Sequence, residues 1–102
     1  MSEQSFLTWL QNKNEWSLRT FGSGQRAEGV LRHIESELEE IRETPDDLFE
    51  WVDVILLALD GAFRSGHSAE QVLDGIYEKQ KINTERTWNI PQPDEPSFHR
   101  GD

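Results

Sequence analysis

The strongest constraint on the fold is a break at residues 44–47, "TPDD", which separates two long stretches of helical periodicity. Thr44 can cap a helix, Pro45 suits the first helical position, and acidic residues favour a helix N-terminus. Apolar residues recur three and four positions apart on both sides of the break. The sequence therefore predicts two amphipathic helices joined by a tight turn, one over about residues 26–43 and one reaching about residue 65.

Two further helices are predicted outside this pair. Residues 4–20 carry large apolar side chains at roughly helical spacing, and "GSG" at 22–24 ends the pattern. The four residues "SAEQ" at 68–71 match a capping box, in which a serine and a glutamine satisfy each other's backbone groups. The helix that they begin is expected to continue to about Arg86.

The chain from Trp88 onwards reads "WNIPQPDEPSFHRGD", and its prolines exclude a regular helix. No segment shows the two-residue period of a strand, and no internal repeat is visible. We predict an all-α, four-helix domain over residues 1–88, followed by a Pro-rich C-terminal tail at 89–102. Trp9 and Trp51 are predicted to lie in the core of that domain.

Composition excludes several classes of protein. The 102 residues include 20 acidic and 10 basic side chains, giving a net charge of −10. This charge argues against a nucleic-acid binder, because affinity for phosphate backbones comes from clustered Lys and Arg. There is no cysteine, so disulfides and thiolate metal sites are excluded. No signal peptide and no membrane-spanning run is recognised, so we expect a cytoplasmic protein without a membrane partner.

Two carboxylates stand where a helix should be apolar. Since each helical residue advances by about 100°, Glu37 lies about 60° from Ile34 and about 40° from Ile41, both of which belong to the apolar stripe. Glu40 falls at the edge of the same face. Burial of a bare carboxylate costs several kcal/mol unless the group is neutralised, paired or bound to a cation. An acidic face in contact with water is the simpler alternative for this pair.

The next helix repeats the pattern with Glu50 and Asp53, three residues apart. Asp53 is the only charge between Trp51 and Leu59. A tight turn would bring all four acids together, where they would repel one another unless cations were present. Oxygen ligands without His or Cys suit Mg²⁺ or Mn²⁺, which we therefore predict as cofactor. Alternatively, Asp53 pairs with a base such as Arg32, Arg42 or Lys79.

A basic stripe follows in "KQKINTERTW", where Lys79, Asn83 and Arg86 occupy positions i, i+4 and i+7. Two cations beside an amide donor can bind the oxygens of a phosphate group. A solvated basic face that balances acids on neighbouring helices is the alternative. Trp16 and Phe21, near the Gly-rich break, are candidates for stacking against a nucleotide base.

The order E-x-x-E, E-x-x-D and K-x-x-x-N-x-x-R resembles the MazG-like all-α nucleoside triphosphate pyrophosphohydrolases. Over about residues 5–93, the words "EWSLRTFGSGQRAEGVLRHIESELEEI", "DDLFEWVDVILLALDGAFRSGHS" and "KQKINTERTW" are similar to the bacterial and phage dATP/dGTP pyrophosphohydrolase branch, which includes the MazZ type. One departure concerns the first motif: many members have two adjacent acids before its last Glu, whereas Ser36 precedes Glu37 here. The literal string E-E-x-x-E occurs at Glu39, Glu40 and Glu43, but Glu39 and Glu43 should face water.

The resemblance implies a helical fold that assembles into dimers or tetramers, and a reaction that cleaves a nucleoside triphosphate between the α and β phosphates. Under it, the metal ligands are Glu37, Glu40, Glu50 and Asp53, and Glu37 or Glu40 activates the attacking water. The leaving pyrophosphate would be bound by the basic stripe. Contacts with a partner chain are expected from four apolar residues: Phe49, Ile55, Leu59 and Phe63.

The expected substrate is dGTP or dATP, in the cytoplasm of a bacterium or of a phage-infected host. Two alternatives remain open at this point. One is a pyrophosphohydrolase for dUTP, dCTP or a damaged nucleotide, whose phosphate-binding residues would look the same. The other is a helical interaction module that has the fold without the activity.

Overall fold

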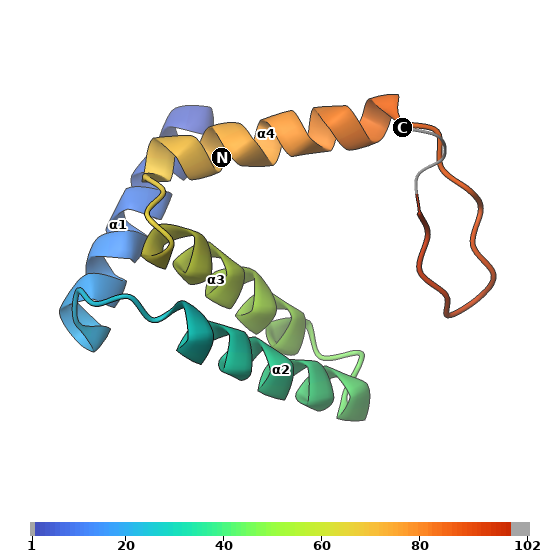
Figure 1. Cartoon of the computed structure of the whole chain (residues 1–102), viewed down its shortest axis with the longest axis horizontal. Helices are drawn as coiled ribbons and strands as arrows, with labels where there is room; N and C mark the ends of the chain where they lie inside the picture. The colour runs from blue at the N-terminus through green and yellow to red at the C-terminus, as the bar shows by residue number, and fades with distance from the viewer. Residues whose placement is uncertain (1, 99–102) are drawn as a thin grey trace.

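The computed structural model describes residues 2–98 and contains four α-helices in sequence order (Figure 1). They are α1 (Glu3–Phe21), α2 (Ala27–Glu43), α3 (Leu48–Arg64) and α4 (Ala69–Glu85). The predicted all-α class is confirmed, and the helix bounds differ from the predicted ones by a few residues at most. Within residues 2–98, no helix is long and apolar enough to cross a membrane.

The α2–α3 hairpin is the most extensive helix pair of the fold (Figure 1). Its turn differs from the prediction. Thr44 does not cap α3, because its backbone N–H still donates to the carbonyl of Glu40 (3.0 Å) in the last turn of α2. Asp47 caps α3 instead, and its carboxylate accepts a hydrogen bond from the N–H of Phe49 (3.0 Å). Pro45 therefore lies in the turn and not in the first turn of α3.

A small core joins α1, α3 and the start of α4. Its buried members are Leu10, Phe63, Ala69 and Leu73, with Phe6, Leu7, Leu59 and Val72 packed around them. The predicted capping box is confirmed at the start of α4: the hydroxyl of Ser68 accepts from the N–H of Gln71 (3.1 Å), and the Gln71 side chain accepts from the N–H of Ser68 (2.8 Å). The capping box fixes the first turn of α4, and the core contacts hold that end of the helix against α1.

The remainder of α4 points away from the hairpin, so that α3 and α4 diverge along their lengths (Figure 1). Among the described residues, α2 and α4 make no contact with each other. The chain is consequently elongated, with principal extents of 43 × 32 × 26 Å. Large apolar side chains on the outer faces of the helices are left uncovered.

Two core predictions are wrong for this reason. Trp9 is 40% exposed and Trp51 is 51% exposed, because no other helix covers their faces. Of the predicted partner contacts, Phe49 and Ile55 are exposed at 75% and 57%. Phe63 is 8% exposed and belongs to the chain's own core, so its assignment to a partner surface is wrong.

The segment after α4 is not helical, in agreement with its prolines. It forms a loop whose ends meet: the N–H of Asn89 donates to the carbonyl of Phe98 (3.4 Å), and the Ser97 hydroxyl donates to the carbonyl of Asn89 (2.6 Å). Residues 99–102 of the predicted tail lie outside the described part of the chain.

Candidate active site

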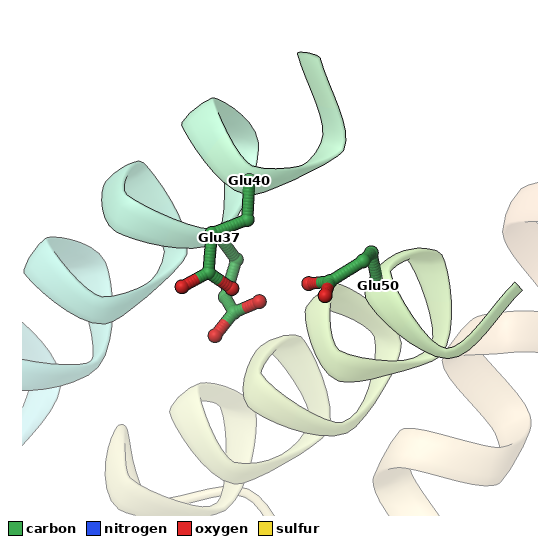
Figure 2. A group of neighbouring side chains, drawn as sticks. All are labelled: Glu37, Glu40 and Glu50. Atoms are coloured by element: carbon green, nitrogen blue, oxygen red, sulfur yellow. The ribbon is translucent and has the colours of Figure 1, made fainter. Parts of the chain in front are cut away.

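Three glutamates meet between α2 and α3. Glu37 and Glu40 come from α2 and Glu50 from the first turn of α3, and their carboxyl groups point toward one another (Figure 2). One carboxylate oxygen from each lies within 4.8 Å of the other two. We call these residues the acid trio. The helical phase of the first pair and the short turn together account for the juxtaposition.

The acid trio has carboxylate oxygens that lack protein partners. Glu37 is buried, with 8% of its surface exposed. The Oε2 atoms of Glu37 and Glu50 are buried, and neither forms a hydrogen bond with the described residues. The other oxygen of Glu37, Oε1, lies 3.4 Å from Nε2 of His33, and this is the one ion pair that Glu37 forms within residues 2–98. Buried carboxylate oxygens without donors fit a cation, so the trio could bind a divalent metal.

Crowding of the carboxyl groups changes their protonation. Desolvation, hydrogen bonding to Glu40 and Glu37, and their negative charges raise the pKa of Glu50 to about 7. Desolvation also raises the pKa of Glu37, with hydrogen bonding to Glu40 and the charges of Glu40 and Asp53 acting in the same direction. Without a cation, the site therefore retains protons near neutral pH.

Asp53, the fourth predicted ligand, is exposed and stands beside the acid trio. It is close enough for its charge to raise the pKa of Glu37. None of the ion pairs among residues 2–98 involves Asp53, so the predicted alternative of pairing with a nearby base is wrong within this chain. Glu39 and Glu43 are exposed as predicted, and Glu39 forms a surface ion pair with Arg42.

A cavity of about 760 Å³ opens between α1, α2 and α3, and Glu37 and Asp53 form part of its wall. The α1 side of the cavity is aromatic, with Trp9, Trp16 and Phe21. The rings of Trp16 and Phe21 meet edge to face with centroids 5.6 Å apart, and the guanidinium of Arg26 lies 5.0 Å from the centre of the Phe21 ring. The cavity thus joins an aromatic wall to Glu37, one member of the acid trio.

A buried polar network lies at the cavity wall. The Ser17 hydroxyl donates to Oδ1 of Asp60 (2.6 Å), and Arg64 Nε lies 3.5 Å from the same oxygen. The Arg64 guanidinium also donates to the Ser17 hydroxyl (2.9 Å) and to the carbonyls of Gly22 (2.5 Å) and Gly24 (2.9 Å). Since Arg64 is 6% exposed and connects α3 to the α1–α2 loop, it fixes the start of the loop that follows the aromatic wall of α1.

Lys13, which was not predicted as a site residue, also lines this cavity. Desolvation lowers the pKa of its ammonium group, and the charge of Asp60 partly opposes that effect. A signal was present in the sequence, because Trp9, Lys13 and Trp16 follow the i, i+4, i+7 spacing of one helix face. Asp60 and Arg64 likewise form an i, i+4 pair of opposite charges in the otherwise apolar C-terminal half of their helix.

The basic stripe lies elsewhere. Lys79 is exposed, Asn83 and Arg86 are half-buried, and Lys79 and Asn83 line a second cavity of about 540 Å³ between α3 and α4. The Oδ1 atom of Asn83 is buried and accepts no hydrogen bond from the described residues. Because α2 and α4 do not touch, the fold of one chain does not bring the stripe to Glu37 and Glu40.

Comparison with known proteins identifies the family. The model of the dATP/dGTP pyrophosphohydrolase family matches residues 9–100, which is nearly the whole chain. No curated protein and no solved structure gives a significant match. The match covers the acid trio, both cavities and the basic stripe. The protein is therefore an enzyme of the MazG-like type and belongs to the dATP/dGTP pyrophosphohydrolase family.

Proposed function

We propose that the protein hydrolyses a purine deoxynucleoside triphosphate, dGTP or dATP, between the α and β phosphates to a monophosphate and pyrophosphate. The observation that carries this proposal is the continuity of the cavity, which has indole rings at one wall and Glu37 at another. Its volume lies in the usual range for small-molecule sites. A base against the aromatic wall would direct its phosphates toward the acid trio.

The carboxylates of Glu37, Glu40, Glu50 and Asp53 would hold Mg²⁺ or Mn²⁺. When bound, such cations neutralise the triphosphate and polarise the phosphorus–oxygen bonds. Glu37 or Glu40 would accept a proton from the water that attacks the α-phosphorus.

Lys79 and Arg86 would stabilise the charge that develops on the leaving pyrophosphate, and Asn83 would orient one of its oxygens. In one chain these residues are separated from Glu37 and Glu40. We therefore infer that the enzyme is a homo-oligomer, a dimer or a tetramer, in which the basic stripe of one copy serves the acid trio of another. The exposed apolar side chains of α3 support an assembly of this kind.

A panel of the eight common ribo- and deoxyribonucleoside triphosphates, assayed with Mg²⁺ or Mn²⁺, tests this function. Pyrophosphate release from dGTP or dATP is the expected result, with no activity in the presence of a chelator. Release of single phosphates would contradict the assigned bond. Faster hydrolysis of dUTP or dCTP than of either purine would leave the chemistry intact and contradict the purine assignment.

A further inference from the structure

The α1 side of the large cavity contains a pair of opposite charges that the proposed chemistry does not use. Lys13 and Asp60 both line the cavity, and Asp60 is close enough for its charge to act on Lys13. Lys13 is half-buried and Asp60 is 7% exposed. A charged pair held partly out of water, beside aromatic rings, is suited to recognise the polar edge of a stacked base.

The two residues offer different hydrogen-bonding groups. An ammonium group has only donors, and an ionised carboxylate has only acceptors. Oδ1 of Asp60 is engaged by Ser17 and Arg64, which fix the orientation of the carboxylate. No hydrogen bond recorded among residues 2–98 uses its second oxygen, Oδ2, so that this atom is available to a ligand in the cavity.

We propose that Lys13 and Asp60 together recognise a guanine base by hydrogen bonds to its polar edge, so that the enzyme prefers dGTP to dATP. This inference rests on the proposed function and narrows its substrate. The O6 atom of guanine would accept from Lys13, while N1–H and the 2-amino group would both donate to Oδ2 of Asp60, the oxygen that Ser17 and Arg64 leave available. In the same pose, adenine would place its 6-amino donor against Lys13 and its N1 lone pair against Asp60.

The position of the aromatic wall supports this arrangement. Trp9, Lys13 and Trp16 share one face of α1, so that a base lying on an indole has the ammonium group beside its edge. Glu37 lies on another wall of the same cavity, where the phosphates are expected. The Arg64 contacts keep the α1–α2 loop and Asp60 in fixed positions, which limits the rotation of a bound base.

The test compares kcat/KM for dGTP, dATP and dITP in the full-length enzyme and in Lys13→Met. Lys81→Met removes the same charge from an exposed position that lines neither cavity, and serves as the control. We expect the wild type to prefer dGTP over dATP by about tenfold to a hundredfold, the range for one good polar pair with a base. Because dITP retains O6 and N1–H but lacks the 2-amino group, its value should be intermediate.

Lys13→Met should lower kcat/KM for dGTP at least tenfold and that for dATP less than twofold, whereas Lys81→Met should change neither. Equal activity of the wild type on dGTP and dATP, or an equal loss on both in Lys13→Met, would overturn the inference. Calorimetric binding of the α,β-imido analogues of dGTP and dATP with Mg²⁺ separates the two proposals. Preferential binding of the guanine analogue by a protein that hydrolyses neither nucleotide would support recognition of guanine and contradict the proposed activity. Equal binding of the two analogues would overturn recognition of guanine by Lys13 and Asp60.

Discussion

At the scale of single residues, the acid trio should lower the stability of the protein when no metal is bound. The pKa of Glu50 is raised to about 7 in the folded chain from an ordinary value of 4.5. Between these two values the folded state holds more protons than the unfolded state, so stability must fall as the pH rises. We predict that the melting temperature of the chelator-treated protein decreases from pH 5 to pH 8.

Glu50→Gln should flatten this decrease, because the amide does not titrate. Its melting temperature in chelator should exceed that of the wild type at pH 8 and differ least from it at pH 5. Added Mg²⁺ or Mn²⁺ should stabilise the wild type more than the variant at pH 8. Thermal denaturation followed by circular dichroism at both pH values measures all three effects, and a wild-type stability that rises with pH would contradict the prediction.

Glu37 and Glu39 form a matched pair of residues two positions apart on α2, one buried and one exposed. We predict that Glu37→Gln lowers kcat by about a hundredfold or more, the scale of losing one strong electrostatic contact at a reacting group, and weakens metal binding. Glu39→Gln should retain the activity. Calorimetric metal titration and pyrophosphate assays on both folded variants check this. Inactivation by Glu39→Gln would instead favour the E-E-x-x-E string as the ligand set.

At the scale of helices and loops, Arg64 connects α3 to α1 and to the α1–α2 loop. Arg64→Ala would remove the guanidinium that pairs with the buried carboxylate of Asp60, and breaking a buried ion pair in this way costs about 3–5 kcal/mol of unfolding free energy. Arg32→Ala is the control, since the Arg32–Glu28 pair is exposed and such pairs contribute about 0–1 kcal/mol. Urea denaturation of both variants measures the difference, and similar losses would contradict a structural role for Arg64.

The same elements show what the sequence could predict. Positions near one another in the sequence were predicted well: the capping box of α4, the inward phase of Glu37 and the approach of Glu50 across a short turn depend on local geometry. The network of Ser17, Asp60 and Arg64 was not predicted, because Ser17 on α1 lies 43 and 47 residues before its two partners on α3. Helical phase shows which way a side chain points but not which distant helix it meets.

The exposure of Trp9 and Trp51 has a related cause. Both follow the apolar periodicity of their helices, and periodicity identifies an apolar face without specifying what covers it. The direction of α4, which leaves these faces open, depends on the small core formed with Leu10 and Phe63. A pattern of one chain cannot distinguish a face buried in its own core from a face buried by another copy.

At the scale of the whole molecule, the separation of the basic stripe from the acid trio can be tested by mixing inactive variants. In an assembly whose sites are shared, a chain with Glu37→Gln still supplies Lys79, and a chain with Lys79→Ala still supplies Glu37. We predict that the two variants, mixed in equal amounts and allowed to exchange subunits, recover roughly a quarter of wild-type activity, since half of the dimers are mixed and each has one intact site.

Two controls belong to that experiment. Two preparations of Glu37→Gln, mixed with each other, should remain inactive, and light scattering of the wild type at micromolar concentration should give the mass of a dimer or tetramer. A monomeric mass with full activity would contradict the assembly. An oligomer without recovery of activity in the mixture would show that each chain completes its own site.

The divergence of α4 from the hairpin also implies an order of local opening. Amide hydrogens in the C-terminal half of α4 have few tertiary contacts around them and should exchange with deuterium sooner than those of α2 near Glu37. Association of a second copy would slow that exchange. If sites are shared as proposed, hydrolysis depends on protein concentration more steeply than linearly, because chains diluted below the dissociation constant of the assembly fold without completing a site. Under the proposed activity, a cell that made only a little of this enzyme would hydrolyse little of its dGTP or dATP.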